Sequence, residues 1–356
     1  MRLSPLLNGL RFAAGIDICP DGVRTVVMSH KLGGLTRPCL EHIGVAPLAP
    51  DAMAGAELLD TRGASLAIVQ TLGTLYSPRF AASLRVAMAI APSATLIATV
   101  PRGQLERADE VDPVPPDVRR HATADDATLD DLEPAIRAHA EALLGLERST
   151  MAVDWFAQRG PLATPDHLTI AAAAREHIDA RIDAAAGAGL QLIAIDAEPV
   201  AALRACRYVA GHEIARTFDP DAVYAVLWLG QDSTHVWAMY RDQPIRELRM
   251  LAQTDIPASL LGSLAVFAKS LVSEATAAAA EWPIPTELTC AYVAGDLDRL
   301  LNAGIALDTI ATVLGCPVEE FMPRGECADR PRVGMPTIRP ASLAVAFGLA
   351  LRAVLQ

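Results

Sequence analysis

Two hairpins contain residues that could bind a phosphate group, and the first lies near the start of the chain. Residues 12–19 (FAAGIDIC) and 23–28 (VRTVVM) have the composition of strands, and Pro20-Asp21-Gly22 predicts a tight turn between them. The backbone amides of such a turn can face an anion, while Asp17 could hold the water shell of a magnesium ion. On the residues alone, a hairpin that only reverses the chain is the more common case.

A second hairpin is expected in the middle of the chain. Residues 222–230 (AVYAVLWLG) form a strongly apolar strand, residues 231–233 a turn, and residues 234–240 (THVWAMY) the returning strand. A later strand, residues 290–294, ends at Gly295-Asp296. The pattern therefore predicts a second hairpin and a glycine-ended strand after it.

The elements that position these hairpins are organised around residues 168–208. Strands are predicted at residues 168–172 and 191–195, each followed by a helix. Gly187 and Gly189 end the first helix, and Pro199 suits the first turn of the second, which we interpret as a hinge between two halves. The first helix has an apolar face made of Ala174, Ile178, Ile182 and Ala185. Its other positions include Arg175, Glu176, Asp179 and Arg181.

The rest of the sequence is typical of an α/β protein. Further strands are predicted at residues 39–48, 84–90, 95–100, 151–156, 243–250 and 315–318. Further helices are predicted at residues 65–75, 132–146, 258–279, 297–301, 306–314 and 341–355. Residues 101–131 are polar, acidic and rich in proline, which predicts a surface loop. For Trp155 and Phe156, core packing is favoured over contact with a partner, and His139 and His167 are expected on the surface.

Composition excludes several classes of protein. The chain has 356 residues, enough for two domains, and 52% of them are hydrophobic, which argues against disorder. A net charge of −12 disfavours a nucleic-acid surface, and no apolar run is long enough to span a membrane. Six scattered cysteines without a CxxC pair are expected to be small buried residues in a reducing compartment. These features predict a cytoplasmic protein.

The order of these features resembles the actin-like fold, and within it the PilM family of type IV pilus assembly proteins, relatives of FtsA. The matching segments are GIDI followed by VRTVV, LEPAIRAHAEALLGLERSTMAVDWF, AAAAREHIDARIDAAAGAGLQLIAIDAEPVAALRA, AVLWLGQDSTHVWAMYRDQPIRELRM, LGCPVEE and LAVAFGLALRA. The resemblance implies a two-domain ASKHA (RNase H-like) α/β fold with an inserted 1C-type subdomain and a reduced 2B subdomain. It implies domain I at residues 1–94, 173–198 and 337–356, the inserted subdomain at 95–172, and domain II at 199–336.

The resemblance also implies where ATP and Mg²⁺ would bind. The corresponding nucleotide-site residues are Asp17, Asp21, Arg24, Glu198, Gly230, Gln231, Ser233, Thr234 and Gly295, with Asp17 as the candidate metal ligand. Glu198 or Asp196 could orient a water molecule.

Departures from the family pattern put this site in doubt. Trp228 stands where the family has an aspartate, and Cys19-Pro20-Asp21 replaces Gly-Ser-Ser, which removes an amide and adds a negative charge. A helix that contacts adenosine in the family is missing between Met250 and Ala258. We therefore predict a degenerate nucleotide site with no catalytic residues.

The function that the resemblance implies is that of a cytoplasmic adaptor of a type IV pilus, or of a related competence or secretion machine, with a role in pilus biogenesis and twitching motility. It would associate with the inner membrane by binding the N-terminal tail of a PilN-like membrane protein in a groove between the first and inserted subdomains. Pilus motor or platform proteins and a second copy of the chain are further candidate partners. An ATP-switched ATPase in which Asp232 supplies the missing carboxylate is the alternative. A sugar or acetate kinase is a third reading, for which the sequence offers no catalytic-base loop.

Overall fold

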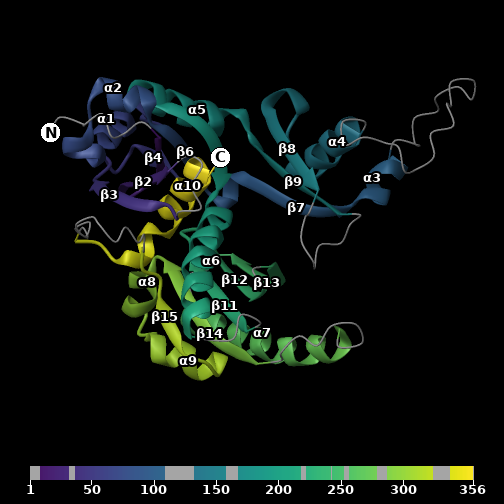
Figure 1. The fold of residues 1–356 in the computed structure, drawn as a ribbon. Coiled ribbons are helices and arrows are strands. Elements are labelled where there is room, and N and C mark those ends of the chain that lie inside the picture. Colours follow the sequence, from purple (N-terminus) through teal and green to yellow (C-terminus); the bar gives the residue numbers. More distant parts are fainter. Residues whose placement is uncertain are drawn as a thin grey trace, which may run out of the picture. The chain divides into compact units, whose positions relative to one another are not determined.

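The computed structural model divides into two compact units, residues 1–92 with 180–356 and residues 93–179 (Figure 1). It describes residues 9–31, 37–108, 132–157, 167–217, 222–241, 243–251, 256–278, 287–323 and 337–355. The larger unit is called the main unit below, and residues 93–179 are called the inserted unit. The predicted division of the main unit into domains I and II at residues 198 and 336 stays a prediction.

The first sheet of the main unit has the strand order β10-β6-β1-β2-β3. Its strands are β1 (Leu10–Cys19), β2 (Gly22–Lys31), β3 (Cys39–Ala46), β6 (Arg85–Ile90) and β10 (Gln191–Ala197). β2 pairs antiparallel with both β1 and β3, whereas β6 runs parallel to both β1 and β10. β1 is buried from Ala13 to Cys19 because both faces of the sheet are covered, which explains its nearly continuous apolar run.

The second sheet of the main unit repeats this topology with the order β13-β12-β11-β14-β15. Its strands are β11 (Val223–Leu229), β12 (Ser233–Tyr240), β13 (Gln243–Leu251), β14 (Leu288–Gly295) and β15 (Val318–Glu320). An antiparallel β11–β12 hairpin and parallel β11–β14 and β14–β15 pairs correspond one for one to the first sheet. The two sheets are therefore copies of one architecture.

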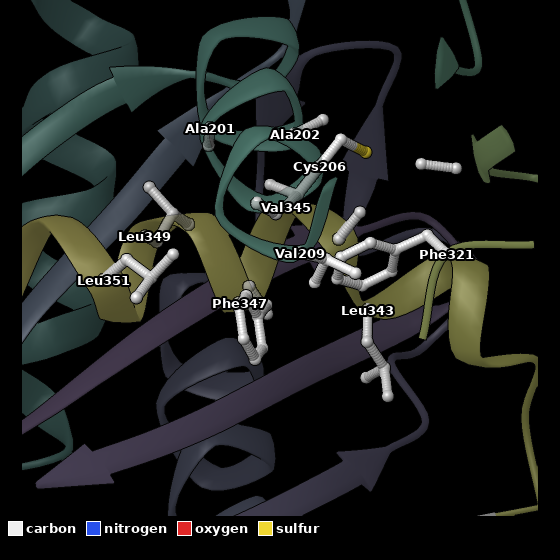
Figure 2. Close-up of a cluster of buried hydrophobic side chains, with 14 of the residues drawn as sticks. Ala201, Ala202, Cys206, Val209, Phe321, Leu343, Val345, Phe347, Leu349 and Leu351 are labelled. Atoms are coloured by element: carbon white, nitrogen blue, oxygen red, sulfur yellow. The ribbon is translucent and has the colours of Figure 1, made fainter. Parts of the chain in front are cut away.

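Two helices join the cores of the two sheets. In Figure 2, α6 (Glu198–Thr217) crosses α10 (Ala344–Leu355), and side chains of both helices meet Phe321 and Leu343. This cluster continues into β1, β2 and β6 on one side and β11, β12 and β14 on the other. The helices approach closely because Gly348 has no side chain where a Cβ would collide with the carbonyl oxygen of Ala201. One core thus connects both halves of the main unit.

Shorter elements complete the main unit. They are α1 (Thr61–Leu72), α2 (Pro78–Ser83), α7 (Ile256–Ala278), α8 (Leu297–Asn302), α9 (Leu307–Leu314) and the strand pair β4 (Met53–Ala54) and β5 (Glu57–Leu58). Among the described residues, 3₁₀ turns lie at Gly73–Leu75 and Pro340–Leu343 in this unit, at Pro92–Ala94 on the boundary between the units, and at Arg148–Thr150 in the inserted unit. α5 (Arg175–Gly187) starts in the inserted unit and continues into the main unit, where Ser65 on α1 donates a hydrogen bond to the carbonyl of Ala184.

The inserted unit is a three-stranded sheet with helices on one face. The strand order is β7-β9-β8, with β7 (Thr95–Pro101), β9 (His167–Ala174) and β8 (Met151–Ala157) all antiparallel. α3 (Arg102–Ala108) and α4 (Glu133–Leu144) pack against one face of the sheet. Leu105 and Ile136 from these helices pack with Val100, Leu168 and Ile170 in a separate apolar core.

Several sequence predictions need correction. Residues 102–108 form helix α3 instead of a loop, and residues 109–131 lie outside the described part of the chain. On α5, Ile182 is 46% exposed and Arg181 is buried, the reverse of the prediction at these two positions, whereas Ala185 is buried as predicted. Phe156 is 55% exposed, whereas Trp155 packs against the core of the inserted unit.

The cysteines follow the prediction in part. Cys19, Cys206, Cys290 and Cys316 are free and buried, as expected from their apolar surroundings. Cys39 is disulfide-bonded, contrary to the expectation of reduced thiols. Cys327 lies outside the described residues.

Candidate functional site

The first hairpin holds its charged residues close together. β1 and β2 pair up to Cys19 and Gly22, so that Pro20 and Asp21 form the turn, as predicted. Gly22 has a φ of +155°, and a Cβ there would approach the carbonyl oxygen of Ala46 on β3. Asp17 lies opposite Arg24 in the register. The tight turn therefore places Asp17, Asp21 and Arg24 at one end of the sheet.

Arg24 is the centre of this group. Its Nη2 donates to Asp21 Oδ2 at 2.5 Å, and its Nη1 lies 3.5 Å from Asp17 Oδ2 and contacts Cys19 Sγ. Burial lowers the pKa of the guanidinium, but Cys19, Asp17 and Asp21 raise it by more, so the net shift is upward. Arg24 is therefore firmly charged and engaged by the hairpin itself.

Two further elements add charges to this group. Glu198, the first residue of α6, interacts electrostatically with Asp17, with Asp232 of the second hairpin, and with Arg181 and Arg24. Burial raises the pKa of Glu198 well above its usual value, and repulsion from Asp17 and Asp232 raises it further, against the attraction of the two arginines. The pKa of Asp17 is also raised, with burial the largest cause and Arg24 opposing it.

Arg181 is the cation that the sequence pattern missed. Its side chain is 1% exposed, and it donates to the backbone carbonyls of Ala89 and Ala56 through Nε and Nη2, at 3.3 Å and 3.2 Å. Burial lowers its pKa, while Glu198 and Asp17 raise it. Because a helix stripe through Ile178 and Ala185 passes position 181 as well as 182, the periodicity could have placed Arg181 inside.

The second hairpin is built from apolar and aromatic side chains instead. Trp228 is 2% exposed and belongs to the core around α6 and α10, and its indole lies against the Cα of Gly230. His235 is buried beside it, with ring centroids 5.7 Å from Trp228 and 5.2 Å from Trp237. At the position of the family's aspartate, the chain thus provides an apolar ring and no oxygen ligand.

Hydrogen bonds inside the second hairpin engage its polar groups. Ser233 Oγ lies 3.2 Å from His235 Nε2, and His235 Nδ1 lies 3.0 Å from Glu247 Oε1 on β13. Ser233 also donates to Asp232 Oδ1 at 3.4 Å, and the amide of Gly230 donates to the carbonyl of Ser233. The hydroxyl that the resemblance assigns to phosphate is therefore occupied by protein neighbours.

The end of β14 closes on the second hairpin. Gly295 has a φ of +90°, and a Cβ there would collide with the backbone of Leu229. Asp296 caps α8 by accepting a hydrogen bond from the amide of Arg299. The Nη1 of Arg299 donates to the carbonyls of Gly230 and Gln231, at 3.3 Å and 3.2 Å. Arg299 was not among the predicted site residues, and a helix-start arginine gives no sequence signal for this contact.

Asp196 has a different role from the predicted one. Its Oδ2 pairs with Arg204 on α6 at 2.8 Å and with Arg352 on α10 at 3.0 Å. Arg204 also donates to the carbonyl of Gly348, and Arg352 to that of Ile195. Asp196 therefore links α6 and α10 where they cross. Its carboxylate is paired with Arg204 and Arg352 instead of orienting a water molecule.

The predicted site residues thus fall into three groups. Asp17, Asp21, Arg24 and Glu198 come together, joined by Asp232 and Arg181. Gly230, Gln231 and Gly295 form the backbone contact with Leu229 and Arg299 just described. Ser233 belongs to the His235 network, and Thr234 is a half-buried ladder residue of β12 opposite Leu229.

The described residues do not form a magnesium site made of protein side chains alone. Among the residues that the structure describes, no group of three or more His, Cys, Asp and Glu side chains is arranged to hold a metal. Asp17 Oδ2 faces Arg24, while Asp17 Oδ1 is buried without a hydrogen-bond partner among those residues. Where the resemblance implies a second aspartate, the chain has Trp228. Mg²⁺ in nucleotide sites takes most of its near-octahedral oxygen shell from water and phosphates, with one or two carboxylates from the protein.

Comparison with known proteins finds similarity at the level of structure. No protein-family model matches the sequence, and no curated protein matches it. Two sheets of one strand order packed on the same crossing helices define an actin-like fold, which confirms the predicted fold class. The chain is similar to a solved PilM–PilN type IV pilus biogenesis complex, with a TM-score of 0.62 and 18% identity, over 96% of this chain and 98% of that chain.

Two further solved structures match with lower scores. One is a Bacteroides thetaiotaomicron protein of unknown function with an actin-like ATPase fold (TM-score 0.42, 9% identity, 89% of this chain and 94% of that chain). The other is the cytoplasmic domain of EpsL, an inner-membrane component of the Vibrio cholerae type II secretion system (TM-score 0.39, 10% identity, 80% and 81%). At these identities the likeness is one of fold.

Proposed function

We propose that this chain is an adaptor that binds the N-terminal tail of a PilN-like inner-membrane protein in a type IV pilus or a related competence or secretion machine. It would be cytoplasmic and reach the inner membrane through that partner. Its nucleotide site is degenerate, so that binding of the tail does not depend on ATP. In the described residues, no helix is long and apolar enough to cross a membrane.

The similarity to the PilM–PilN complex carries this proposal. It extends over 96% of this chain and 98% of the other, so the inserted unit has a counterpart as well as the two sheets of the main unit. The inserted unit is shared by two proteins that are only 18% identical, although we infer that the nucleotide site of this chain has diverged. This favours a function that the inserted unit performs. We assign the tail-binding role to that unit.

The face of the inserted sheet opposite α3 and α4 has the chemistry for this role. Side chains alternate across each strand, so Trp155 packs with Val100 and Ile170 against the helices, while Phe156 lies on the opposite face. Ile97 on β7 belongs to the same face as Phe156 and is 39% exposed, against 55% for Phe156. Exposed apolar side chains on a sheet face are typical of a contact surface.

The edges of the same sheet offer main-chain hydrogen bonds. Among the described residues, β7 and β8 each pair with β9 alone, so each strand has one unpaired edge. An extended peptide can add to such an edge and place alternate side chains against the apolar face. We therefore propose that the tail pairs with β8 and contacts Phe156.

A peptide-binding experiment tests this function. The probe is a fluorescently labelled peptide with the sequence of the cytoplasmic N-terminal tail of the PilN-like protein encoded in the same genome, titrated with the full chain and followed by anisotropy. We expect saturable binding that Phe156→Asp weakens by about tenfold or more, as for loss of an apolar anchor. Leu143→Asp is the matched control, because Leu143 is 52% exposed on α4 in the same unit.

Two outcomes would contradict the proposal. The first is a wild-type chain that does not bind the tail peptide, which would remove the adaptor function. The second is equal weakening by Phe156→Asp and Leu143→Asp, which would place the contact elsewhere. Micromolar binding of ATP by the wild-type chain would instead favour the ATP-switched alternative, since Asp17, Arg24 and Glu198 do lie together.

A further inference from the structure

We propose that the end of the first sheet opposite the β1–β2 turn is a surface that binds the anionic lipids of a membrane. This basic end comprises Arg11, Lys31, Arg37, Arg79 and Arg85. Its partner is the negatively charged headgroup layer itself, in addition to the tail peptide bound elsewhere. The inference rests on the proposed function only in that the adaptor works next to the inner membrane.

The strand register brings these cations together. Arg11, near the start of β1, lies opposite His30, and Lys31 is the last residue of β2. Arg85 is the first residue of β6, which pairs parallel to β1 close to this point. Arg37 comes just before β3, which is antiparallel to β2 and therefore starts at the same end of the sheet. Four neighbouring strands thus contribute positive charge to one end.

Helix α2 adds a further cation to the same end. Phe80 of α2 contacts Phe12 of β1, with ring centroids 5.7 Å apart, and its neighbour Arg79 is exposed, as is Lys31. In the part of the chain that the structure describes, the side chains of Arg79, Lys31, Arg11 and Arg85 have no ion pair. Their charges are therefore available to an external partner, unlike that of an arginine paired within the fold.

Acidic residues are scarce around this end. In the described residues of α2 and of the strands of the first sheet, Glu41 on β3 is the acid in this half, and it accepts a hydrogen bond from Ser29. Asp183, exposed near the end of α5, is a further acid on a helix that leads to this end. The sequence at residues 1–8 and 32–36, which connect to β1 and β3, contains no aspartate or glutamate. The end therefore carries a positive charge in a chain whose net charge is −12.

The opposite end of the same sheet has the opposite charge. The β1–β2 turn lies there with Asp17 and Asp21, and Glu198 interacts electrostatically with Asp17. An anionic surface attracts the basic end and repels this acidic one. Charge alone would therefore orient the first sheet with its basic end toward the lipid.

The second sheet shows that this charge does not follow from the topology. Its equivalent end is formed by the starts of β11 and β14 and the end of β12. Glu287 is exposed just before β14, and the sequence places Asp219 and Asp221 before β11 and Asp242 between β12 and β13, against Arg241. The same architecture thus has mostly acids in one copy and cations in the other, which indicates a partner specific to the first sheet.

The apolar residues around the basic end favour a lipid surface over an acidic protein. Leu10, Phe12 and Phe80 lie half-buried at the same end as the cations. Residues 1–8, which lead into β1, contain three leucines and no acid. Arginine and lysine combined with leucine and aromatic side chains are typical of segments that bind the interface of an anionic membrane.

Flotation of the full chain with lipid vesicles tests the inference. We expect the wild type to float with phosphatidylcholine vesicles that contain about 30% phosphatidylglycerol, and not with phosphatidylcholine alone. Lys31→Glu with Arg79→Glu should lower the partition coefficient by at least about tenfold, because attraction becomes repulsion. The matched control is Arg62→Glu with Lys269→Glu, which makes the same change in net charge at exposed positions of α1 and α7 and should change partitioning by less than about twofold.

Thermal melting shows whether these variants fold, and Lys31→Gln with Arg79→Gln, which only removes the charges, should lose an intermediate amount of binding. No flotation of the wild type with anionic vesicles, or equal losses in the Lys31/Arg79 and Arg62/Lys269 charge reversals, would overturn the proposal. Binding of polyglutamate without binding of anionic vesicles would also overturn it, in favour of an acidic protein partner. The vesicles contain no PilN-like protein and the tail peptide is titrated without lipid, so failure of this inference and failure of the adaptor function are distinguishable.

Discussion

The two equivalent hairpins of the main unit differ in the side chains that they place at corresponding positions. The β1–β2 hairpin keeps Asp17 and Arg24 and adds Asp21, so its polar groups now pair with one another. The β11–β12 hairpin carries Trp228, whose ring is part of the central core, where the resemblance implies an aspartate. Asp21 in the first hairpin forms an exposed ion pair with Arg24. Trp228 in the second hairpin is buried and contributes to the stability of the fold.

Substitutions of Asp21 and of Trp228 should therefore have different consequences. Exposed charges contribute little to stability, so altering Asp21 should change folding little. A buried indole contributes several kcal/mol, so altering Trp228 should change folding first. Substitutions in the two hairpins should therefore have effects of very different size on the free energy of unfolding.

The largest effect is expected for Trp228→Asp. It removes a buried ring and places a carboxylate in the core beside His235 and Gly230, at an expected cost of about 4 kcal/mol or more in the free energy of unfolding. Urea denaturation followed by circular dichroism measures it. Trp228→Phe, which keeps an apolar ring, is the control and should cost clearly less. Equal stability of Trp228→Asp and the wild type would show that the buried ring of Trp228 contributes no more to stability than the exposed Asp21.

The next largest effect is expected for Arg24→Gln. Without Arg24, Asp17 loses its nearest cation while it stays buried, which should cost about 2–3 kcal/mol at pH 7. The double variant Arg24→Gln with Asp17→Asn should regain most of this loss, because it leaves no uncompensated charge. Urea unfolding of both variants checks the prediction. A double variant no more stable than Arg24→Gln would show that Arg24 acts through packing and not through Asp17.

The effect of Glu198→Gln on the free energy of unfolding should depend on pH. The folded-state pKa of Glu198 is raised, so folding is favoured while the carboxyl is protonated and this stability is lost as pH rises through the folded pKa. The variant should therefore be more stable than the wild type at pH 8, by about 1.4 kcal/mol for each unit of pKa shift. Below the unfolded pKa, near the ordinary glutamate value of 4.5, the advantage should vanish.

Thermal melting between pH 4 and pH 8 measures this difference. Glu319→Gln is the control, because Glu319 is exposed on β15. A Glu198→Gln variant less stable than the wild type at pH 8 would mean that the ionised carboxylate, held by Arg24 and Arg181, stabilises the cluster.

The smallest effect is expected for Glu247→Gln in the second hairpin network. Glu247 is 51% exposed where it pairs with His235 Nδ1, so the charge should contribute about 0.5 kcal/mol or less, and the amide oxygen can still accept. Urea unfolding at pH 6 and pH 8 measures it. A loss above about 1.5 kcal/mol would indicate that the buried His235 depends on an ionic partner, which would make the second hairpin electrostatic like the first.

The sequence predicts the fold well because its strongest patterns are those that define the sheets. Tight turns at Pro20-Asp21 and after Gly230, and fully apolar strands such as β1 and β11, fix the two hairpins. α3 was missed because a polar segment beside prolines has no apolar stripe to reveal it. On α5, only positions 181 and 182 were assigned wrongly. Both fit the apolar stripe, and Arg181 is buried because its guanidinium donates to the backbone carbonyls of Ala56 and Ala89.

The candidate site was predicted less completely for a physical reason. The resemblance implied Asp17, Arg24 and Glu198 as site residues, and in the structure Glu198 interacts electrostatically with both of the others. Contacts such as Arg299 on the carbonyl of Gly230, or Asp196 between Arg204 and Arg352, join segments far apart in the sequence. No local pattern encodes such pairs, because either partner would look like an ordinary surface residue.

If the chain is an adaptor that works without a nucleotide, its affinity for the tail peptide should not depend on ATP. The dissociation constant of the PilN-like tail peptide is measured by anisotropy for the wild-type chain with no nucleotide and with millimolar ATP and Mg²⁺. We expect binding in both conditions, with dissociation constants that agree within about twofold, or about 0.4 kcal/mol. No binding of the peptide, or a tenfold change on addition of ATP and Mg²⁺, would contradict it.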